Sequence, residues 1–264
     1  MLYFLKQVLK KNYFIYSICR FLYERIFILN YYRLKNIIRS LINYKINKTF
    51  KSHPKEESKI ILYNKEFFYP KHSTFINEKY KNLGIGGKLH SQYNLLAKEF
   101  FEEEIECILD VGANIGYLSL FYNKFFGNKI KIHCFEPHPI SYFFLEKNLS
   151  SLDNIKLYNF ALGNENKEDY MSIPKYQGLL RLGAMSIGQH SNDFKIKVLI
   201  KKLDLLPISF QQFKTIYIKI DVEGYEYDVL KGMSNFLNSN LHFYLKIEIL
   251  GREINEAKII SMIN

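Results

Sequence analysis

Cysteine is scarce in this sequence. The 264-residue chain has three cysteines, Cys19, Cys107 and Cys134, and none of them stands in a C-x-x-C spacing. An odd number without that spacing argues against a disulfide framework or a zinc site. Cys107 and Cys134 fall within largely apolar runs, so we expect small buried side chains of a protein in a reducing cytoplasm.

A long uncharged apolar run is also absent. Residues 1–50 are rich in Leu, Ile, Phe and Tyr, but charged side chains interrupt every stretch that approaches the roughly 20 residues needed to span a bilayer. No small-residue cleavage site follows an apolar core, so a cleavable signal peptide is not expected. There is no internal repeat and no low-complexity linker. The hydrophobic fraction of 48% suffices for a substantial core.

Acidic residues are nearly missing from the N-terminal part of the chain. Residues 1–51 carry eleven Lys or Arg and one acid, Glu24, whereas the remaining 213 residues hold 26 basic and 25 acidic side chains. Of the net charge of +11, +10 therefore belongs to the N-terminal segment, and the body of the protein is nearly neutral.

Residues 1–50, called the arm below, carry a helical pattern. Leu34, Ile37, Ile38, Leu41 and Ile42 recur at helical spacing, which predicts a basic amphipathic helix. Such a helix can lie on an anionic membrane, where each basic residue contributes about 1 kcal/mol. It can equally pack on the rest of the protein or on a second protomer. The charge asymmetry slightly favours the membrane, and single-stranded nucleic acid is a weaker third alternative.

The chain divides into three segments: the arm at residues 1–50, a connecting segment at 51–90, and a domain at 91–264. In the connecting segment, residues 59–63 and 66–69 flank Asn64-Lys65 and can pair as a short hairpin, although this turn lacks the usual glycine.

The domain alternates helical and strand-like patterns. This order implies a parallel sheet that is covered on both faces and binds its ligand beyond the carboxyl ends of the strands. We expect strands at residues 105–110, 129–135, 155–160, 215–220 and 241–249, and helices at 91–104, 117–126, 140–149, 225–237 and about 255–263.

Two predicted strands end in an acidic residue, and the first of them is followed by a glycine turn. The first predicted strand delivers Asp110 to the edge of the sheet, and Gly112 and Gly116 allow the backbone to turn tightly against a ligand. The spacing is D-x-G-x-x-x-G and not the G-x-G-x-x-G of dinucleotide-binding dehydrogenases. Glu136 ends the second strand, where an acid can accept both hydroxyls of a ribose. His138 beside it is more often a solvated or capping residue than a catalytic one.

A third motif places Lys219, Asp221 and Glu223 at the end of a hydrophobic strand. Three ionisable groups at a strand tip are costly unless they are paired or used. Asp221 could simply cap the next helix, and Lys219 could simply neutralise it. We favour a functional role because the motif coincides with the expected ligand edge.

These segments together resemble the FkbM-type methyltransferases, whose motifs are D-V-G-A-N-x-G, F-E-P, A-L-G, L-D and K-x-D-V-E-G-x-E-x-x-V-L-x-G. Here they stand at residues 110–116, 135–137, 161–163, 203–204 and 219–232. The resemblance implies a Rossmann-like class I methyltransferase sheet and methyl transfer from S-adenosylmethionine to a hydroxyl, often on a sugar or a secondary metabolite. It further implies that Asp110, Gly112, Asn114 and Gly116 line the methionine end, that Glu136 holds the ribose, and that Ala161 and Leu162 border the adenine.

The chain departs from the family pattern in two places. Lys202 stands where the family usually has Thr. The family sheet normally ends with a sixth and a seventh strand, whereas this sequence stops at Asn264, within the helix expected after the fifth strand. The resemblance therefore predicts a sheet that lacks its last C-terminal β-hairpin, and a truncated product with impaired stability or activity.

Methyl transfer to an alcohol needs a base. Asp221 or Glu223 is the candidate base, Lys219 would orient it, and Glu248 on the fifth strand is a lesser candidate. No spacing demands a metal ion. The expected acceptor is a small molecule or a glycan, and the expected location is the cytoplasm, with the arm at the inner face of the membrane. Two rivals remain: an RNA methyltransferase, for which the N/D-P-P-Y/F tetrad of amine-methylating enzymes is missing, and a non-catalytic S-adenosylmethionine-binding protein.

Overall fold

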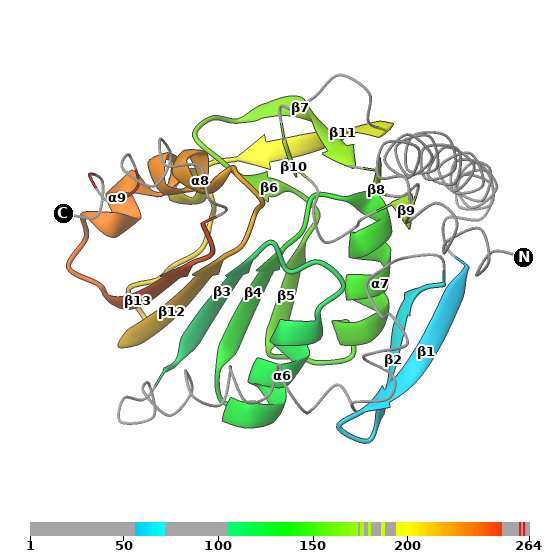
Figure 1. Ribbon diagram of the computed structural model, residues 1–264. Helices are drawn as coiled ribbons and strands as arrows, with labels where there is room; N and C mark the ends of the chain where they lie inside the picture. The colour runs from blue at the N-terminus through cyan, green and yellow to red at the C-terminus, as the bar shows by residue number, and fades with distance from the viewer. Residues whose placement is uncertain are drawn as a thin grey trace, which may run out of the picture.

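A parallel five-stranded sheet forms the centre of the protein (Figure 1). The computed structural model describes residues 56–71, 105–173, 175–176, 179–180, 186–187, 194–249, 259 and 261. The strand order β13-β12-β3-β4-β5 places the two halves of the chain on either side of β3, as in doubly wound α/β sheets, so the expected mixed α/β fold with a parallel sheet is confirmed. The strands are β3 (Cys107–Val111), β4 (Lys131–Phe135), β5 (Ile155–Tyr158), β12 (Thr215–Ile220) and β13 (His242–Ile247).

Helices cover both faces of this sheet. All five residues of β3 are buried, as expected of a parallel strand that is covered on both sides. Ile108 packs with α6 (Tyr117–Phe126) and α7 (Pro139–Leu149), whereas Leu109 packs with α8 (Glu226–Gly232) and α9 (Ser234–Leu237). The predicted single helix at residues 225–237 is thus two short helices, because the chain turns at Met233.

An antiparallel hairpin precedes the sheet and lies beside α7 (Figure 1). It consists of β1 (Glu57–Leu62) and β2 (Lys65–Pro70), so the expected pairing is present. The turn is Tyr63-Asn64, one residue earlier than the sequence suggested. Both turn residues have positive φ, 52° and 63°, which is the geometry that favours glycine in a type I′ turn, and here Tyr and Asn adopt it.

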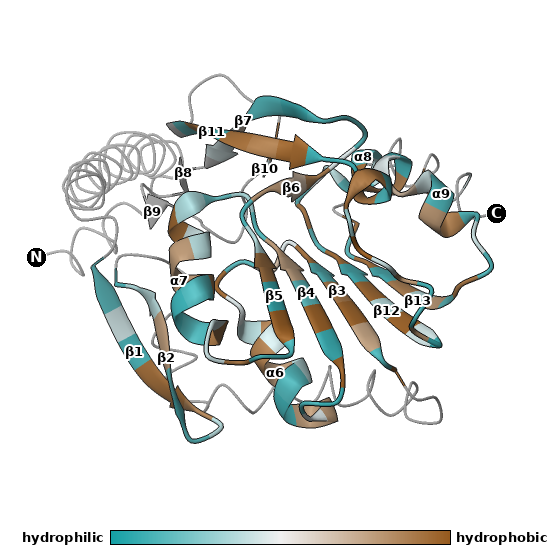
Figure 2. Ribbon diagram, turned by 180° about the vertical axis from the view of Figure 1, so that it is seen from behind, coloured by the Kyte–Doolittle hydropathy of each residue, from teal (hydrophilic) through white to brown (hydrophobic). Residues whose placement is uncertain are grey.

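A second sheet is inserted between β5 and β12, in residues 161–214, for which the sequence pattern predicts no strand or helix. Its order is β10-β7-β11-β6, and it lies beyond the carboxyl ends of the parallel strands (Figure 2). Its core packs against Ile140 of α7 and against Tyr225. The strands are β6 (Ala161–Leu162), β7 (Lys167–Ile173), β10 (Ser186–Ile187) and β11 (Phe194–Lys201), and β8 (Lys175–Tyr176) pairs separately with β9 (Leu179–Leu180).

Three of the motif residues, Gly163, Asp204 and Gly232, have packing or capping roles in the fold. A Cβ at Gly232 would lie 1.8 Å from the carbonyl oxygen of Gly163, so the two backbones touch only because position 232 is glycine. Asp204, in the short 3-10 helix η2 (Leu203–Leu205), accepts hydrogen bonds from the N–H groups of Asn235 at 2.9 Å and Phe236 at 3.0 Å. It therefore caps α9 from a distance. These residues explain the A-L-G, L-D and L-x-G motifs as packing and capping.

Several expectations fall outside the described residues. They include the arm, the helix at residues 91–104 and most of the C-terminal helix, of which only Ile259 and Ser261 are described, both as helical. Within the described part of the chain, no helix combines the length and the apolarity that a membrane crossing requires. The division into three segments and the missing last hairpin stay predictions.

Candidate functional site

The turn between β3 and α6 lies against the neighbouring strand ends on both sides. Gly112 and Gly116 have positive φ, 82° and 86°. The N–H groups of Gly112 and Ala113 donate to the carbonyl of Phe135 at 3.0 and 3.1 Å, which joins the turn to the end of β4. A Cβ at position 112 would lie 2.0 Å from the carbonyl oxygen of Asp221, so only glycine allows this approach to the end of β12.

A polar cluster on the buried side of this turn consists of Asp110, Ser119, Lys219 and Asp221. Lys219 and Asp110 are register partners on adjacent parallel strands, so their side chains project from the same face of the sheet. Lys219 Nζ lies 3.3 Å from Asp110 Oδ1 and 3.4 Å from Asp221 Oδ2, and it donates to the carbonyl of Gly112 at 3.1 Å. Ser119 Oγ of α6 donates to Asp110 Oδ2 at 2.5 Å.

Neighbouring charges decide the protonation state of Lys219, whose side chain is 6% exposed. Burial by itself lowers its pKa, but the negative charges of Asp110 and Asp221 outweigh burial and raise the pKa above its ordinary value. Lys219 is therefore a fixed cation at neutral pH, suited to hold and orient carboxylates and unsuited to accept a proton.

Both described cysteines are buried free thiols, as the sequence predicts. Cys134 Sγ lies 3.1 Å from Ser119 Oγ, at the side of the polar cluster. Burial raises the pKa of Cys107 to about 12 and also raises that of Cys134, so neither forms a thiolate nucleophile at neutral pH.

Glu136 follows β4 and faces the turn from the other side. Its Oε2 accepts the N–H of Asn114 at 2.9 Å, and its Oε1 accepts the N–H of His138 at 2.8 Å. The residue is 3% exposed, and burial raises its pKa to about 7 despite these hydrogen bonds. His138 caps α7 by accepting the N–H of Ser141, so the capping alternative is confirmed, although the ring is fully buried and not solvated.

The end of β12 carries the remaining ionisable candidates. Asp221 is the accessible end of the polar cluster, with a side chain that is 32% exposed. Glu223 has a positive φ of 54°. Glu226 belongs to the predicted motif, but sequence reasoning assigned no role to it; it is buried and accepts the N–H of Gly224 at 2.7 Å. Glu226 thus fixes the loop that presents Asp221 and Glu223. Glu248 is exposed after β13, and its N–H donates to the carbonyl of Ile220 at 2.9 Å.

The structure places the other predicted residues less favourably for direct contact. Asp110 is fully buried, with its oxygens directed to Ser119 and Lys219. Ala161 and Leu162 lie in two hydrophobic cores, so only their backbone is suited to border a ligand. Their contacts with the cofactor stay predictions. Ser119 was missed because one serine in an apolar helix gives no signal of its own. Among the described residues, no group of three or more His, Cys, Asp or Glu side chains could hold a metal ion.

Comparison with known proteins gives one family and one distant structure. No curated protein sequence matches this chain. The precorrin-6y C5,15-methyltransferase from Geobacter metallireducens GS-15 is 14% identical, with a TM-score of 0.33 over 61% of this chain and 62% of that chain, which is less than two thirds of its length. The family model described as the methyltransferase FkbM domain matches residues 110–259, more than half of this chain and the whole of the turn and cluster. The chain therefore belongs to the FkbM methyltransferase family.

Proposed function

We propose that the protein transfers a methyl group from S-adenosylmethionine to a hydroxyl group on a sugar of a surface glycan or on a related metabolite. The observation that carries this proposal is the chain of contacts from Asp110 through Lys219 to Asp221, which joins the glycine turn to an accessible carboxylate. Glu136 stands on the other side of the same turn. The proposed cofactor-binding edge and the candidate base thus belong to one network of contacts.

Glu136 fits the ribose of the cofactor. Each of its carboxylate oxygens accepts one backbone N–H, and each has a further lone pair for a hydroxyl donor. Its raised pKa indicates that burial is incompletely compensated by the two N–H groups. Two ribose hydroxyls would supply the missing donors, in the manner of acids at this position in dinucleotide-binding sheets.

The residues at the tip of β12 suit proton removal. The bound cofactor would supply a methyl group on a positively charged sulfur. Asp221 would accept the proton of the acceptor hydroxyl as that oxygen takes the methyl group. Lys219 holds the Asp221 carboxylate in place from its buried side. Alignment of the reactants can contribute up to about 7–11 kcal/mol, and a positioned base about 10²–10⁴-fold.

Cofactor affinity is expected to depend on pH through Glu136. Hydroxyl donors favour the ionised carboxylate, and burial raises the pKa of Glu136 to about 7 in the protein without cofactor. Affinity for S-adenosylmethionine should therefore rise with pH, approaching about tenfold per pH unit below neutrality, and should level off above pH 7. In a Glu136→Gln variant, calorimetry should find binding weaker by about 1–3 kcal/mol and without this slope.

Glu106 offers a matched control for this measurement. It lies at the amino edge of the same sheet, and its carboxylate likewise accepts a backbone N–H, from Lys214 at 2.8 Å. Glu106→Gln should keep both the affinity and the pH slope of the unaltered protein. A pH slope that survives in Glu136→Gln would remove Glu136 from the ribose site.

We further propose that the arm binds the inner face of an anionic membrane, where lipid-linked glycan acceptors would be found. The support is its charge, a net +10 on residues 1–51 beside a nearly neutral body. Vesicle co-sedimentation should find that full-length protein binds anionic vesicles and that high salt weakens the binding, since exposed charges are screened beyond about 8 Å at physiological ionic strength. Protein that ignores vesicles, or that binds RNA more strongly than anionic lipid, would contradict this role.

A further inference from the structure

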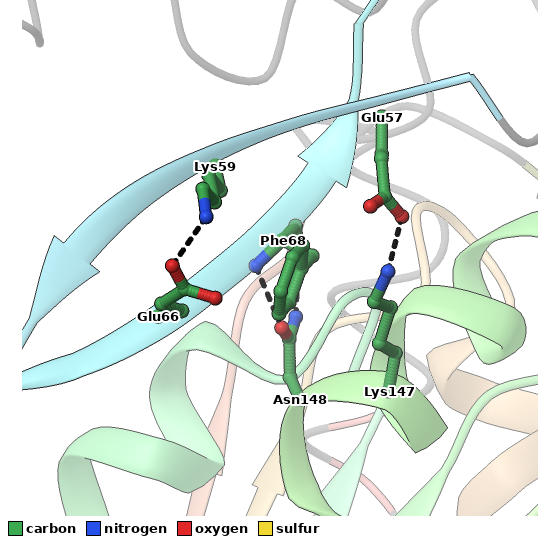
Figure 3. A network of polar contacts seen from close by, with 6 residues as sticks. All are labelled: Glu57, Lys59, Glu66, Phe68, Lys147 and Asn148. Atoms are coloured by element: carbon green, nitrogen blue, oxygen red, sulfur yellow. Dashed lines mark hydrogen bonds and ion pairs between the residues drawn. The ribbon is translucent and has the colours of Figure 1, made fainter.

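One buried side chain, Asn148 near the end of α7, binds the N-terminal hairpin. Its Oδ1 accepts the N–H of Phe68 at 2.7 Å, and its Nδ2 donates to the carbonyl of the same residue at 2.9 Å (Figure 3). A strand that is paired on one side leaves such backbone groups without partners on its other side. The Asn148 amide satisfies both groups of Phe68, in the way that a neighbouring strand would.

The same amide reaches the glycine turn. The second hydrogen-bond donor of Asn148 Nδ2 meets the carbonyl of Ile115 at 2.8 Å. These contacts fix the orientation of the amide, because a flipped side chain would direct its oxygen at two carbonyl oxygens. Asn148 is 1% exposed, so no solvent competes for these bonds. The hairpin and the turn are therefore joined through one side chain.

Further contacts of the hairpin reach the first residue of α6. Tyr117 directly follows the turn, and its ring meets that of Phe67 edge-on, with the ring centroids 6.2 Å apart. Tyr63 shares a side-chain hydrogen bond with Tyr117. A Cβ at Gly116 would lie 2.8 Å from Leu149 Cδ1, so the exit of the turn also fits closely against α7. The far end of the turn is held by Lys219, as described above.

We propose that the hairpin, residues 57–70, is a working part of the cofactor site, and that Asn148 is the positioning residue through which it fixes the turn at residues 112–116. The hairpin precedes residues 110–259, which the family model matches. The effect on cofactor affinity rests on the proposed function. The effect on the order of the turn does not.

Asn154 provides a matched control for Asn148. It is also buried, and its Nδ2 also makes two hydrogen bonds, to Asn123 Oδ1 at 2.8 Å and to the carbonyl of Ile130 at 2.9 Å. It lies just before β5, at the amino edge of the sheet and away from the turn. Replacement by alanine removes three side-chain hydrogen bonds at Asn148 and two at Asn154, so both variants should lose stability, and only Asn148→Ala should affect the turn.

Amide hydrogen exchange, followed by NMR below the melting temperature of both variants, tests the proposal. In Asn148→Ala, the amide protons of Asn114 and Gly116 should exchange about tenfold faster, as expected when a buried hydrogen-bond network is opened. Calorimetry should also find affinity for S-adenosylmethionine about tenfold weaker, within the usual range of coupling between sites. Asn154→Ala should leave both quantities unchanged.

Each outcome is decisive. Equal acceleration at the turn in both variants, or a lower melting temperature in Asn148→Ala with unchanged exchange and affinity, would overturn the positioning role. If neither the unaltered protein nor any variant binds S-adenosylmethionine, the proposed function fails. The exchange rates still decide the role of Asn148 in that case. If Asn148→Ala does not fold, Phe67→Leu loosens the same hairpin from Tyr117 and should accelerate exchange at the same two amides by a smaller factor.

Discussion

Asp221→Asn is expected to lower turnover by about 10²–10⁴-fold while cofactor affinity stays within about twofold, because the amide keeps the shape of the side chain and removes the base. Asp221 is the accessible member of the buried cluster, 3.4 Å from Lys219 Nζ. Its loss leaves Lys219 paired with Asp110, so the cost in folding should be modest. A large loss of rate with intact binding would therefore report on chemistry and not on the fold.

Two neighbouring acids make the measurement selective. Glu223→Gln separates the two candidate bases of the same loop, and Glu248→Gln tests the lesser candidate, which is exposed after β13. Glu106→Gln is the control, because Glu106 lies at the amino edge of the same sheet, where its carboxylate accepts the N–H of Lys214. Turnover is measured as release of S-adenosylhomocysteine with a glycan fraction from cells in which the gene is deleted, and mass spectrometry identifies the methylated product. Full activity in both Asp221→Asn and Glu223→Gln would remove both residues from catalysis.

The parallel sheet could be predicted because its strands are largely hydrophobic and because β3, β4 and β12 each run directly into a glycine turn or an acid. The bounds expected for α6 and β12 are those of the structure. The inserted sheet was missed, although β11 carries a visible signal. Its Ile196, Val198 and Ile200 alternate with Lys195 and Lys197, which is the period of a strand with one face in water. Its partner β7 is polar and gives no such pattern, so the pairing depends on contacts that sequence order does not reveal.

The sequence predicted which residues form the candidate site better than it predicted how their side chains are arranged. The motifs place Asp110, Glu136 and Asp221 at the same edge of the sheet, and the structure brings all three against one turn. Sequence could not tell that Asp110 and Lys219 share a register and point into the protein, because register depends on how two distant strands align. Nor could it tell that Asn148, far from any motif, contacts both hairpin and turn.

The charge of Lys219 should matter for the whole domain. Lys219→Met leaves the buried carboxylate of Asp110 without its counter-ion, and the removal of one partner of a buried pair typically costs about 3–5 kcal/mol. Urea unfolding should detect a loss of this size. The pKa of Lys219 is raised above its ordinary value of 10.5, so its stabilising charge is fully present at neutral pH and is lost only in strongly alkaline solution.

A double substitution distinguishes an uncompensated charge from lost packing. In Asp110→Asn combined with Lys219→Met, no charge remains in the buried pair, so the loss of stability should be clearly smaller than the sum of the two single losses. Lys197→Met is the control, because Lys197 pairs with Glu168 on the exposed face of the inserted sheet and should cause no measurable loss. If the two losses simply add, Lys219 stabilises the domain through its methylene packing, and the ion pair is not what holds the turn to the tip of β12.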